Sequence, residues 1–259
     1  MNRLNVDGAA LAYDDVGSGA PPLLLVHGWG SSRASFAPQV AHFAPTHRVV
    51  AIDGRGHGES DAPAQEYTIA GASDDLATAC RELGLARAVV VQHSMDRLGF
   101  DFAARHPDLV LALCVLDGPT LAGPAFDDGG RQFLAGLESE HWQAAIRSFA
   151  EQMMFAPGTP PEVIDQAIAG VLATPRHVLV SSWRHYLDYP TERTLAEVTC
   201  PLLHVGGAFP ADVERLRSLC PQLETAEVRN RGHFIQLTAA EDVNRIIAGF
   251  VDRVSAAVA

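Results

Sequence analysis

Three residues that together can perform nucleophilic catalysis each follow a predicted strand of this 259-residue chain. Ser94 lies between the strand-like run 88–91 and a helix, Asp117 ends the apolar run 111–116, and His233 precedes the last helix. The carboxyl ends of parallel strands meet at one edge of a sheet, where open sheets bind ligands. In the order Ser, Asp, His these residues could act as nucleophile, orienting acid and general base.

Each of these residues also has an ordinary structural interpretation. Serine often caps a helix N-terminus, and an aspartate after a strand often forms a turn. A helix N-terminus, however, also favours the negative charge that develops at a nucleophile. Placement of Ser94, Asp117 and His233 at one sheet edge therefore favours a shared catalytic function.

The elements that must position these residues alternate between β-like and helix-like segments. We predict a hairpin in residues 3–13, strands at 23–26, 48–53, 88–91, 111–116, 201–205 and 224–228, and helices at 73–83, 95–105 and 239–254. Strands separated by helices indicate a doubly wound, mostly parallel α/β sheet. Residues 119–198 carry no β-type run and concentrate aromatic side chains. We therefore expect a core of residues 1–118 and 199–259, with residues 119–198 as a helical cap inserted after the sixth strand.

Four short motifs resemble the α/β-hydrolase superfamily along nearly the whole chain. They are His27-Gly28-Trp29-Gly30, the segment DGRGHGES at 53–60, His93-Ser94-Met95, and Gly232-His233. The resemblance implies that Ser94 is the nucleophile and His233 the base. It also implies that the backbone N–H groups of Trp29 and Met95 form an oxyanion hole. His27 and His57 are structural loop residues by the same analogy.

The serine turn departs from the family pattern. The family has Gly-x-Ser-x-Gly, because the backbone at the nucleophile is strained and its helix packs tightly on the strand. Here Gln92 and Asp96 replace the two glycines. Either the turn is slightly opened, with a polar side chain near the site, or Ser94 no longer acts as a nucleophile.

The acid of the triad has two candidate positions. Many relatives carry it after the strand that is predicted here at 201–205, where Asp212 is the first acidic residue. Asp212 is, however, placed to cap the next helix. Other relatives carry the acid one strand earlier, where Asp117 directly ends a strand, and we prefer Asp117.

The leading interpretation is a hydrolase of an ester, lactone or related activated carbonyl of a compact apolar or aromatic molecule. Trp29, His93, Trp142 and Trp183 are the expected substrate-binding residues. An alternative is suggested by a looser resemblance to cofactor-free dioxygenases of N-heteroaromatic 3-hydroxy-4-oxo rings, which use a His-Asp dyad. A third interpretation is a non-hydrolytic protein on the same fold.

Composition limits the remaining function classes. A formal charge of 19 − 31 = −12 argues against nucleic acid or an anionic membrane as the partner, so we expect a small-molecule substrate. A homodimer stays open. No metal-ligand cluster or dinucleotide motif is recognised, so we expect no metal and no cofactor. The start lacks a signal-peptide core, and we expect a cytosolic chain. The expected reduced, mostly buried thiols are Cys80, Cys114, Cys200 and Cys220.

Overall fold

An eight-stranded sheet runs through the protein in the order β1-β2-β4-β3-β5-β6-β7-β8. The computed structural model describes residues 2–229 and 231–257. Neighbouring strands from β4 to β8 pair in parallel, whereas β2 pairs antiparallel with both β1 and β4. The predicted doubly wound, mostly parallel sheet is therefore confirmed.

The predicted strands and helices are observed with small shifts at their ends, and the helices at 33–43 and 235–238 were not predicted. The strands are β1 (Asn2–Val6), β2 (Ala9–Val16), β3 (Leu23–Val26), β4 (Val49–Ile52), β5 (Ala88–His93), β6 (Val110–Leu116), β7 (Leu202–Gly206) and β8 (Leu223–Glu227). The helices of the core are η1 (Arg33–Phe36), α1 (Ala37–Phe43), α2 (Ile69–Glu82), α3 (Asp96–Arg105), α9 (Val213–Leu219), α10 (Ile235–Thr238) and α11 (Ala240–Ala256). Asp7 and Gly8 form the hairpin turn between β1 and β2, both with positive φ.

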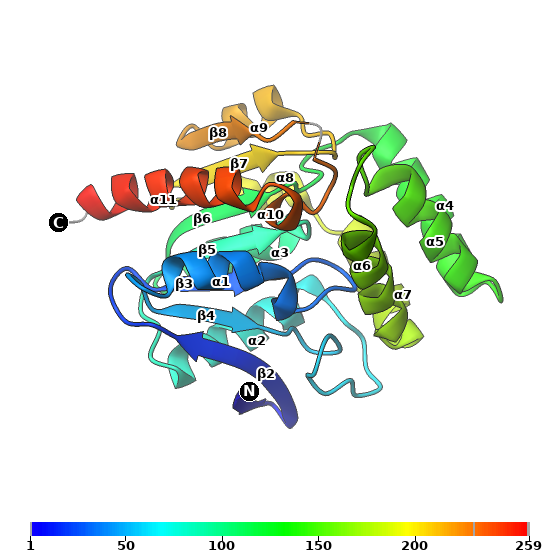
Figure 1. The fold of residues 1–259 in the computed structure, drawn as a ribbon, viewed down its shortest axis with the longest axis horizontal. Coiled ribbons are helices and arrows are strands. Elements are labelled where there is room, and N and C mark those ends of the chain that lie inside the picture. The colour runs from blue at the N-terminus through cyan, green and yellow to red at the C-terminus, as the bar shows by residue number, and fades with distance from the viewer. Residues whose placement is uncertain (1, 230, 258–259) are drawn as a thin grey trace.

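Helices cover both faces of the sheet because its strands are apolar on both faces. In β3, Leu24 and Val26 belong to the core cluster that includes residues of α2, α3 and α9. Leu23 and Leu25 belong to the cluster on the opposite face, with residues of α1 and α11. This alternation is the period of two expected of a strand. Figure 1 shows α1 and α11 in front of the sheet, with α2 and α3 behind it.

The chain between β6 and β7 is helical. It contains α4 (Pro124–Glu138), α5 (Trp142–Met153), α6 (Pro161–Ala173), α7 (Arg176–Leu187) and α8 (Thr191–Leu195). Proline occupies the first turn of α4 and α6, where its missing N–H costs no helical hydrogen bond. Helices α4 to α7 gather at one end of the molecule, beyond the ends of the parallel strands (Figure 1). We refer to α4–α7 as the cap helices.

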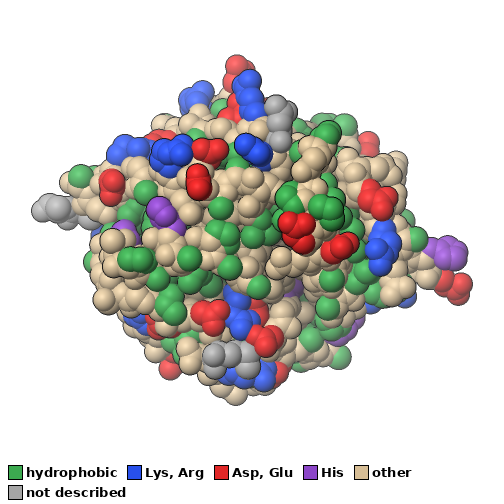
Figure 2. Space-filling model, viewed as in Figure 1, with side chains coloured by type: hydrophobic (Ala, Val, Ile, Leu, Met, Phe, Trp, Pro, Cys, Tyr) green, Lys and Arg blue, Asp and Glu red, His purple; other side chains and the backbone are tan. Residues whose placement is uncertain are grey.

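The surface and the thiols agree with an ordinary globular chain. Acidic and basic side chains are interspersed on the face drawn in Figure 2. Within the described residues, no helix has the length and apolar character needed to cross a membrane. The four cysteines are free and buried, as predicted. Burial raises the pKa of Cys80 to about 12, which keeps this thiol protonated.

Candidate active site

Ser94 lies on a sharp turn between β5 and α3. Its φ of 64° is in the left-handed region, which is costly for a residue other than glycine and is common at functional sites. Two short backbone hydrogen bonds close the turn: Met95 N donates to His93 O at 2.8 Å, and Asp96 N donates to Ser94 O at 2.5 Å. The turn is therefore closed by its own backbone, so a replacement of both family glycines is compatible with a tight turn as well as with the two alternatives given above.

Gln92 is accommodated inside the protein. Its side chain is fully buried, and its amide nitrogen donates to the carbonyl oxygens of His27 at 3.2 Å and His93 at 2.9 Å. The space for it comes from Gly99 on α3, where an added Cβ would lie 3.4 Å from both Cβ and Cγ of Gln92. The contact between β5 and α3 thus still contains a glycine, but the glycine lies on the helix and not on the strand, where the family has it.

Asp96 is also fully buried and ties the turn to the cap helices. Its carboxylate accepts hydrogen bonds from the Tyr186 hydroxyl at 2.7 Å, the Thr120 hydroxyl at 2.6 Å and the Arg97 backbone N–H at 2.9 Å. Gly118 makes room for it, because a Cβ there would lie 2.6 Å from Asp96 Cβ. Neither replacement of a family glycine therefore disrupts the serine turn.

Tyr186 connects Asp96 to the cap through helix α7. The Arg97 guanidinium lies 4.0 Å from the centre of the Tyr186 ring and also donates to the Tyr186 carbonyl oxygen. Burial, with the nearby Asp96 carboxylate, raises the pKa of Tyr186 well above its usual value. The hydroxyl therefore stays protonated and acts as the donor to Asp96.

Asp117 and His233 form a buried pair. His233 Nδ1 lies 2.7 Å from Asp117 Oδ2, and the second oxygen of Asp117 accepts from Phe209 N at 3.0 Å. Gly207 permits this position, because a Cβ there would lie 2.8 Å from Asp117 Cγ. Since a carboxylate only accepts hydrogen bonds, Nδ1 of His233 carries the proton and Nε2 presents a lone pair.

The loop that carries His233 is attached to the cap. His233 N donates to Met154 O, just after α5, at 2.7 Å. Gly232 has a φ of 72°, and an added Cβ would lie 2.7 Å from the same Met154 oxygen. The conformation and the packing both require glycine at this position.

Asp212 lies elsewhere. Its exposed side chain accepts from Arg215 N at 2.9 Å and caps helix α9. The structure thus brings Asp117, rather than Asp212, to the imidazole of His233.

His93 packs against His233 and is buried. The two rings have centroids 4.5 Å apart, and His93 Nε2 donates to the His233 carbonyl oxygen at 3.1 Å. Burial, and secondarily the neighbouring His233, lowers the pKa of His93 well below its usual value. Within the described chain its buried Nδ1 has no hydrogen-bond partner. The neutral His93 ring therefore supports the loop that carries His233, through the ring contact and the hydrogen bond to the His233 carbonyl oxygen.

Aromatic and apolar side chains surround Ser94. A small cavity of about 20 Å³ touches it, which is space for about one water molecule. Its lining residues are Trp29, Ser94, Met95, Pro119, Phe126, Phe149, Met154, Trp183, Tyr186 and Phe209. Among the described residues, therefore, no charged side chain lines this cavity.

The three predicted tryptophans differ in their positions. Trp29 and Trp183 line the Ser94 cavity with ring centroids 5.3 Å apart. Their indole N–H groups donate to Leu179 O and Gly130 O at 3.2 and 2.9 Å, so the rings present only apolar surface. Trp142 packs on the same aromatic cluster as a half-buried residue, outside the lining of that cavity.

The backbone at Trp29 lies beside the serine. Gly28 packs so closely that an added Cβ would lie 2.8 Å from Ser94 Cβ. Across residues 2–229 and 231–257, the Trp29 backbone N–H donates no hydrogen bond, whereas Met95 N–H is used within the turn. The N–H groups of Trp29 and Met95 are the two predicted oxyanion donors, and among the described residues that of Trp29 has no acceptor.

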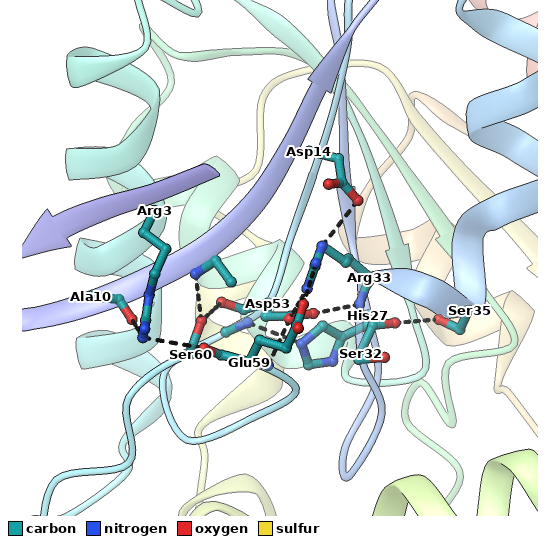
Figure 3. Close-up of polar contacts among 12 residues, drawn as sticks. Arg3, Ala10, Asp14, His27, Ser32, Arg33, Ser35, Asp53, Glu59 and Ser60 are labelled. Carbon is teal, nitrogen blue, oxygen red and sulfur yellow. Dashed lines mark hydrogen bonds and ion pairs between the residues drawn. The ribbon is translucent and has the colours of Figure 1, made fainter. Parts of the chain in front are cut away.

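An ionic network around the buried Asp53 carboxylate joins the loops that follow β3 and β4 (Figure 3). Asp53 is fully buried and accepts from the backbone N–H groups of Arg33 at 2.6 Å and Glu59 at 2.9 Å. The Arg33 guanidinium pairs with both Asp53 and Glu59 and, at 3.0 Å, with Asp14. Several donors on one buried carboxylate offset its loss of hydration.

His27 and His57 are structural in this arrangement. His27 Nδ1 donates to Gly28 O at 2.7 Å, and its Nε2 accepts from Gly54 N at 2.9 Å. His57 Nδ1 donates to Arg55 O at 3.1 Å. Burial, and secondarily the nearby His27, lowers the pKa of His57 to about 3, so the ring is neutral at pH 7.

Comparison with known proteins agrees with the fold. The family described as alpha/beta hydrolase fold matches residues 21–240. The chain belongs to the α/β-hydrolase fold family. It is a hydrolase of this fold, similar over 96% of its length to the 2-(acetamidomethylene)succinate hydrolase of Mesorhizobium japonicum, with 29% identity and 94% of that protein covered.

Two solved structures show the same fold as this hydrolase. A thermophilic esterase from Thermogutta terrifontis superposes with a TM-score of 0.86 at 24% identity, over 98% of this chain and 99% of the other. The enol-lactonase from Burkholderia xenovorans LB400 superposes with a TM-score of 0.84 at 22% identity, over 97% and 100%.

Sequence reasoning missed several residues of the candidate site. Tyr186 and Thr120 hold Asp96, and Phe209 both donates to Asp117 and packs edge-on to His233 with centroids 4.5 Å apart. The sequence contained one signal. Asp96 stands where the family has glycine, and a carboxylate buried at that position needs hydrogen-bond donors from other parts of the chain. Groups of three or more His, Cys, Asp or Glu able to hold a metal are absent from the described residues.

Proposed function

We propose that the protein hydrolyses an uncharged carboxylic ester or lactone of a compact apolar or aromatic molecule, with Ser94, His233 and Asp117 as the triad. The observation that carries the proposal is the 2.7 Å contact between His233 Nδ1 and Asp117 Oδ2, in a site where Ser94 lies on a strained turn. This contact leaves the other ring nitrogen of His233 able to accept a proton.

In the proposed mechanism, Ser94 Oγ attacks the substrate carbonyl while His233 Nε2 takes the hydroxyl proton. Asp117 stabilises the imidazolium. The Trp29 N–H, unpaired among the described residues, stabilises the oxyanion and is joined by the Met95 N–H as that group leaves the His93 carbonyl oxygen; a dedicated donor is worth about 2.7–4 kcal/mol. His233 then gives its proton to the leaving alcohol. Water, deprotonated by the same imidazole, cleaves the acyl-serine and regenerates Ser94.

The apolar lining argues for an uncharged substrate next to the reacting carbonyl. A carboxylate there would lose hydration without gaining a cation, since within the described part of the chain the Ser94 cavity has no charged lining residue. The Mesorhizobium relative is named for a succinate derivative. We therefore expect the two proteins to differ in substrate charge.

A fluorophosphonate that reacts with activated serines tests the proposal. It should label Ser94 in the native protein. Labelling should vanish in Ser94→Ala and slow by about 10³-fold or more in His233→Ala, because an unassisted serine is a weak nucleophile. Ser73→Ala, which removes another buried serine outside the lining of the cavities near Ser94, is the matched control and should label normally. A folded wild-type protein that is not labelled would refute nucleophilic catalysis by Ser94.

Base-only chemistry is the second candidate, and one observation favours it. Ser94 Oγ makes no hydrogen bond to any described residue, whereas the His233–Asp117 dyad is complete. A dyad alone could deprotonate a 3-hydroxy-4-oxo heteroaromatic ring for reaction with oxygen. Catalytic hydrogen bonds of ligand-free sites are often long, however, and shorten with substrate, so the hydrolase ranks first. Oxygen uptake with a hydroxyquinolone, retained in Ser94→Ala, would reverse this ranking.

A further inference from the structure

A second cavity, much larger than the one at Ser94, lies beside the serine turn. It has a volume of about 310 Å³ and is bounded by the sheet, by the loop that follows β4 and by helix α2. We call it the α2 cavity. Its apolar lining includes Leu11, Ile52, Ile69, Leu76 and Leu98. Volumes of about 300 Å³ and above are typical of small-molecule sites.

The α2 cavity and the Ser94 cavity share two residues. Both are lined by Trp29 and Met95, the residues whose N–H groups are the proposed oxyanion donors. A carbonyl bound at these two residues would therefore lie next to both cavities. The Ser94 cavity, at about 20 Å³, has no room for more than about one small group. The larger substituent of the substrate needs the α2 cavity.

Another large hollow approaches the site but fits this role less well. It has a volume of about 500 Å³ and touches Phe209, between β7 and β8. It is lined by neither Trp29 nor Met95, and His204 and Glu227 contribute to its wall. It therefore borders the Asp117 side of the site rather than the oxyanion donors.

The charges around the α2 cavity select against anions. Its lining includes four acidic residues and one basic residue, which gives 1 − 4 = −3, or −2 when Arg105, which lies outside the lining and pairs with Asp74 at 2.8 Å, is counted. The basic residue, Arg55, is already paired with Asp75 at 2.7 Å, and both side chains are largely buried. An anionic substituent would meet negative potential and find its only cation occupied, whereas an uncharged apolar group would gain burial.

We propose that the α2 cavity binds the larger, uncharged apolar arm of the ester, with the carbonyl held at Ser94. The inference rests on the proposed function. It adds the position of that arm, its charge and the residues that limit its length. Ala72, a half-buried residue of α2, lines the cavity, so a larger side chain at this position would reduce the cavity volume.

The experiment uses methyl esters, in which one arm is minimal. The substrates are methyl acetate, methyl octanoate and monomethyl suberate, the last carrying a carboxylate at the far end of an arm of the same length. Octyl acetate reports whether the long arm enters from the alcohol side. Rates are measured by titration of the released acid, as kcat/KM for each substrate.

The variant Ala72→Leu fills the cavity with three more carbon atoms while keeping a good helix former. We expect it to lower kcat/KM for the preferred eight-carbon ester by about tenfold or more and to leave methyl acetate within about twofold. Ala104→Leu is the matched control, because Ala104 is a half-buried helical alanine on the same core cluster but outside the cavity lining. Wild type should prefer methyl octanoate over monomethyl suberate by about tenfold or more.

Equal losses on short and long esters in Ala72→Leu, or equal rates on octanoate and suberate, would overturn the inference. If the wild type hydrolyses none of these esters, the proposed function fails and the cavity is tested separately. Calorimetric binding of 2-octanone, an unreactive uncharged analogue, should then weaken about tenfold in Ala72→Leu and be unchanged in Ala104→Leu. Equal binding to all three proteins, or no binding to the wild type, would also overturn it.

Discussion

The contact between Asp96 and Tyr186 joins the serine turn to a cap helix and can be broken by removing one oxygen atom. Tyr186→Phe keeps the ring that lines the Ser94 cavity and deletes only the hydroxyl, which donates to Asp96 at 2.7 Å. Asp96 is fully buried and retains two other donors, Thr120 and Arg97 N–H. Loss of a hydrogen bond to a charged group costs about 1.5–3 kcal/mol. With a urea m-value of about 3 kcal/mol/M, the midpoint of unfolding should fall by about 0.5–1 M.

A double-mutant cycle isolates this interaction. Urea unfolding of wild type, Tyr186→Phe, Asp96→Ala and the double variant should give a coupling energy of about 1.5–3 kcal/mol. The same contact holds the cap over the serine turn. The rate at which fluorophosphonate labels Ser94 should therefore also fall in Tyr186→Phe, by about tenfold.

The matched control is Tyr189→Phe. Its hydroxyl donates at 2.6 Å to Asp101, a carboxylate farther along the same helix α3, and Tyr189 is not part of the Ser94 cavity. It should lose stability without any change in labelling of Ser94. A coupling energy below about 0.5 kcal/mol for Asp96 and Tyr186, or equal labelling of both tyrosine variants, would refute the reasoning.

Three further predictions concern other parts of the molecule. Gly207→Ala should lower kcat/KM about 10²-fold by displacing the Asp117 carboxylate, whereas Gly206→Ala, whose new Cβ would meet nothing closer than 3.9 Å, should stay within about twofold; steady-state kinetics on an ester substrate decides. The pKa of His57 is about 3 in the folded protein and 6.5 in the unfolded chain. As the pH falls below 6.5, only the unfolded chain takes up a proton, so the stability that is present above pH 6.5 is progressively lost. Wild type should therefore lose about 2 kcal/mol more than His57→Gln between pH 7 and 5 in urea titrations, and exposed His141→Gln should behave as wild type. The four buried cysteines, whose pKa values are raised by burial, should react with iodoacetamide at pH 8 only after denaturation, and modification of the native protein would contradict the structure.

Local sequence was sufficient to place the chemistry at one sheet edge. Ser94 and Asp117 follow apolar runs that predicted strands, His233 follows the predicted strand at 224–228, and the strands are where they were expected. The order of β-like and helix-like segments likewise predicted the sheet, because periodicity and turn residues are local properties. The preference for Asp117 also came from adjacency to a strand end, and it is Asp117 that contacts His233.

Tertiary structure alone decided how the unusual serine turn is accommodated. Gln92 and Asp96 fit because Gly99 and Gly118 lie opposite them, and the donors to Asp96 include Tyr186, 90 residues away in sequence. Such complementarity depends on how closely two elements pack, which no local pattern encodes. The same holds for the two cavities that meet at Trp29, because their sizes of about 20 and 310 Å³ follow from cap helices and loops that are distant in sequence. Residue type and strand order determined where catalysis could occur, and long-range packing determined the space left for a substrate.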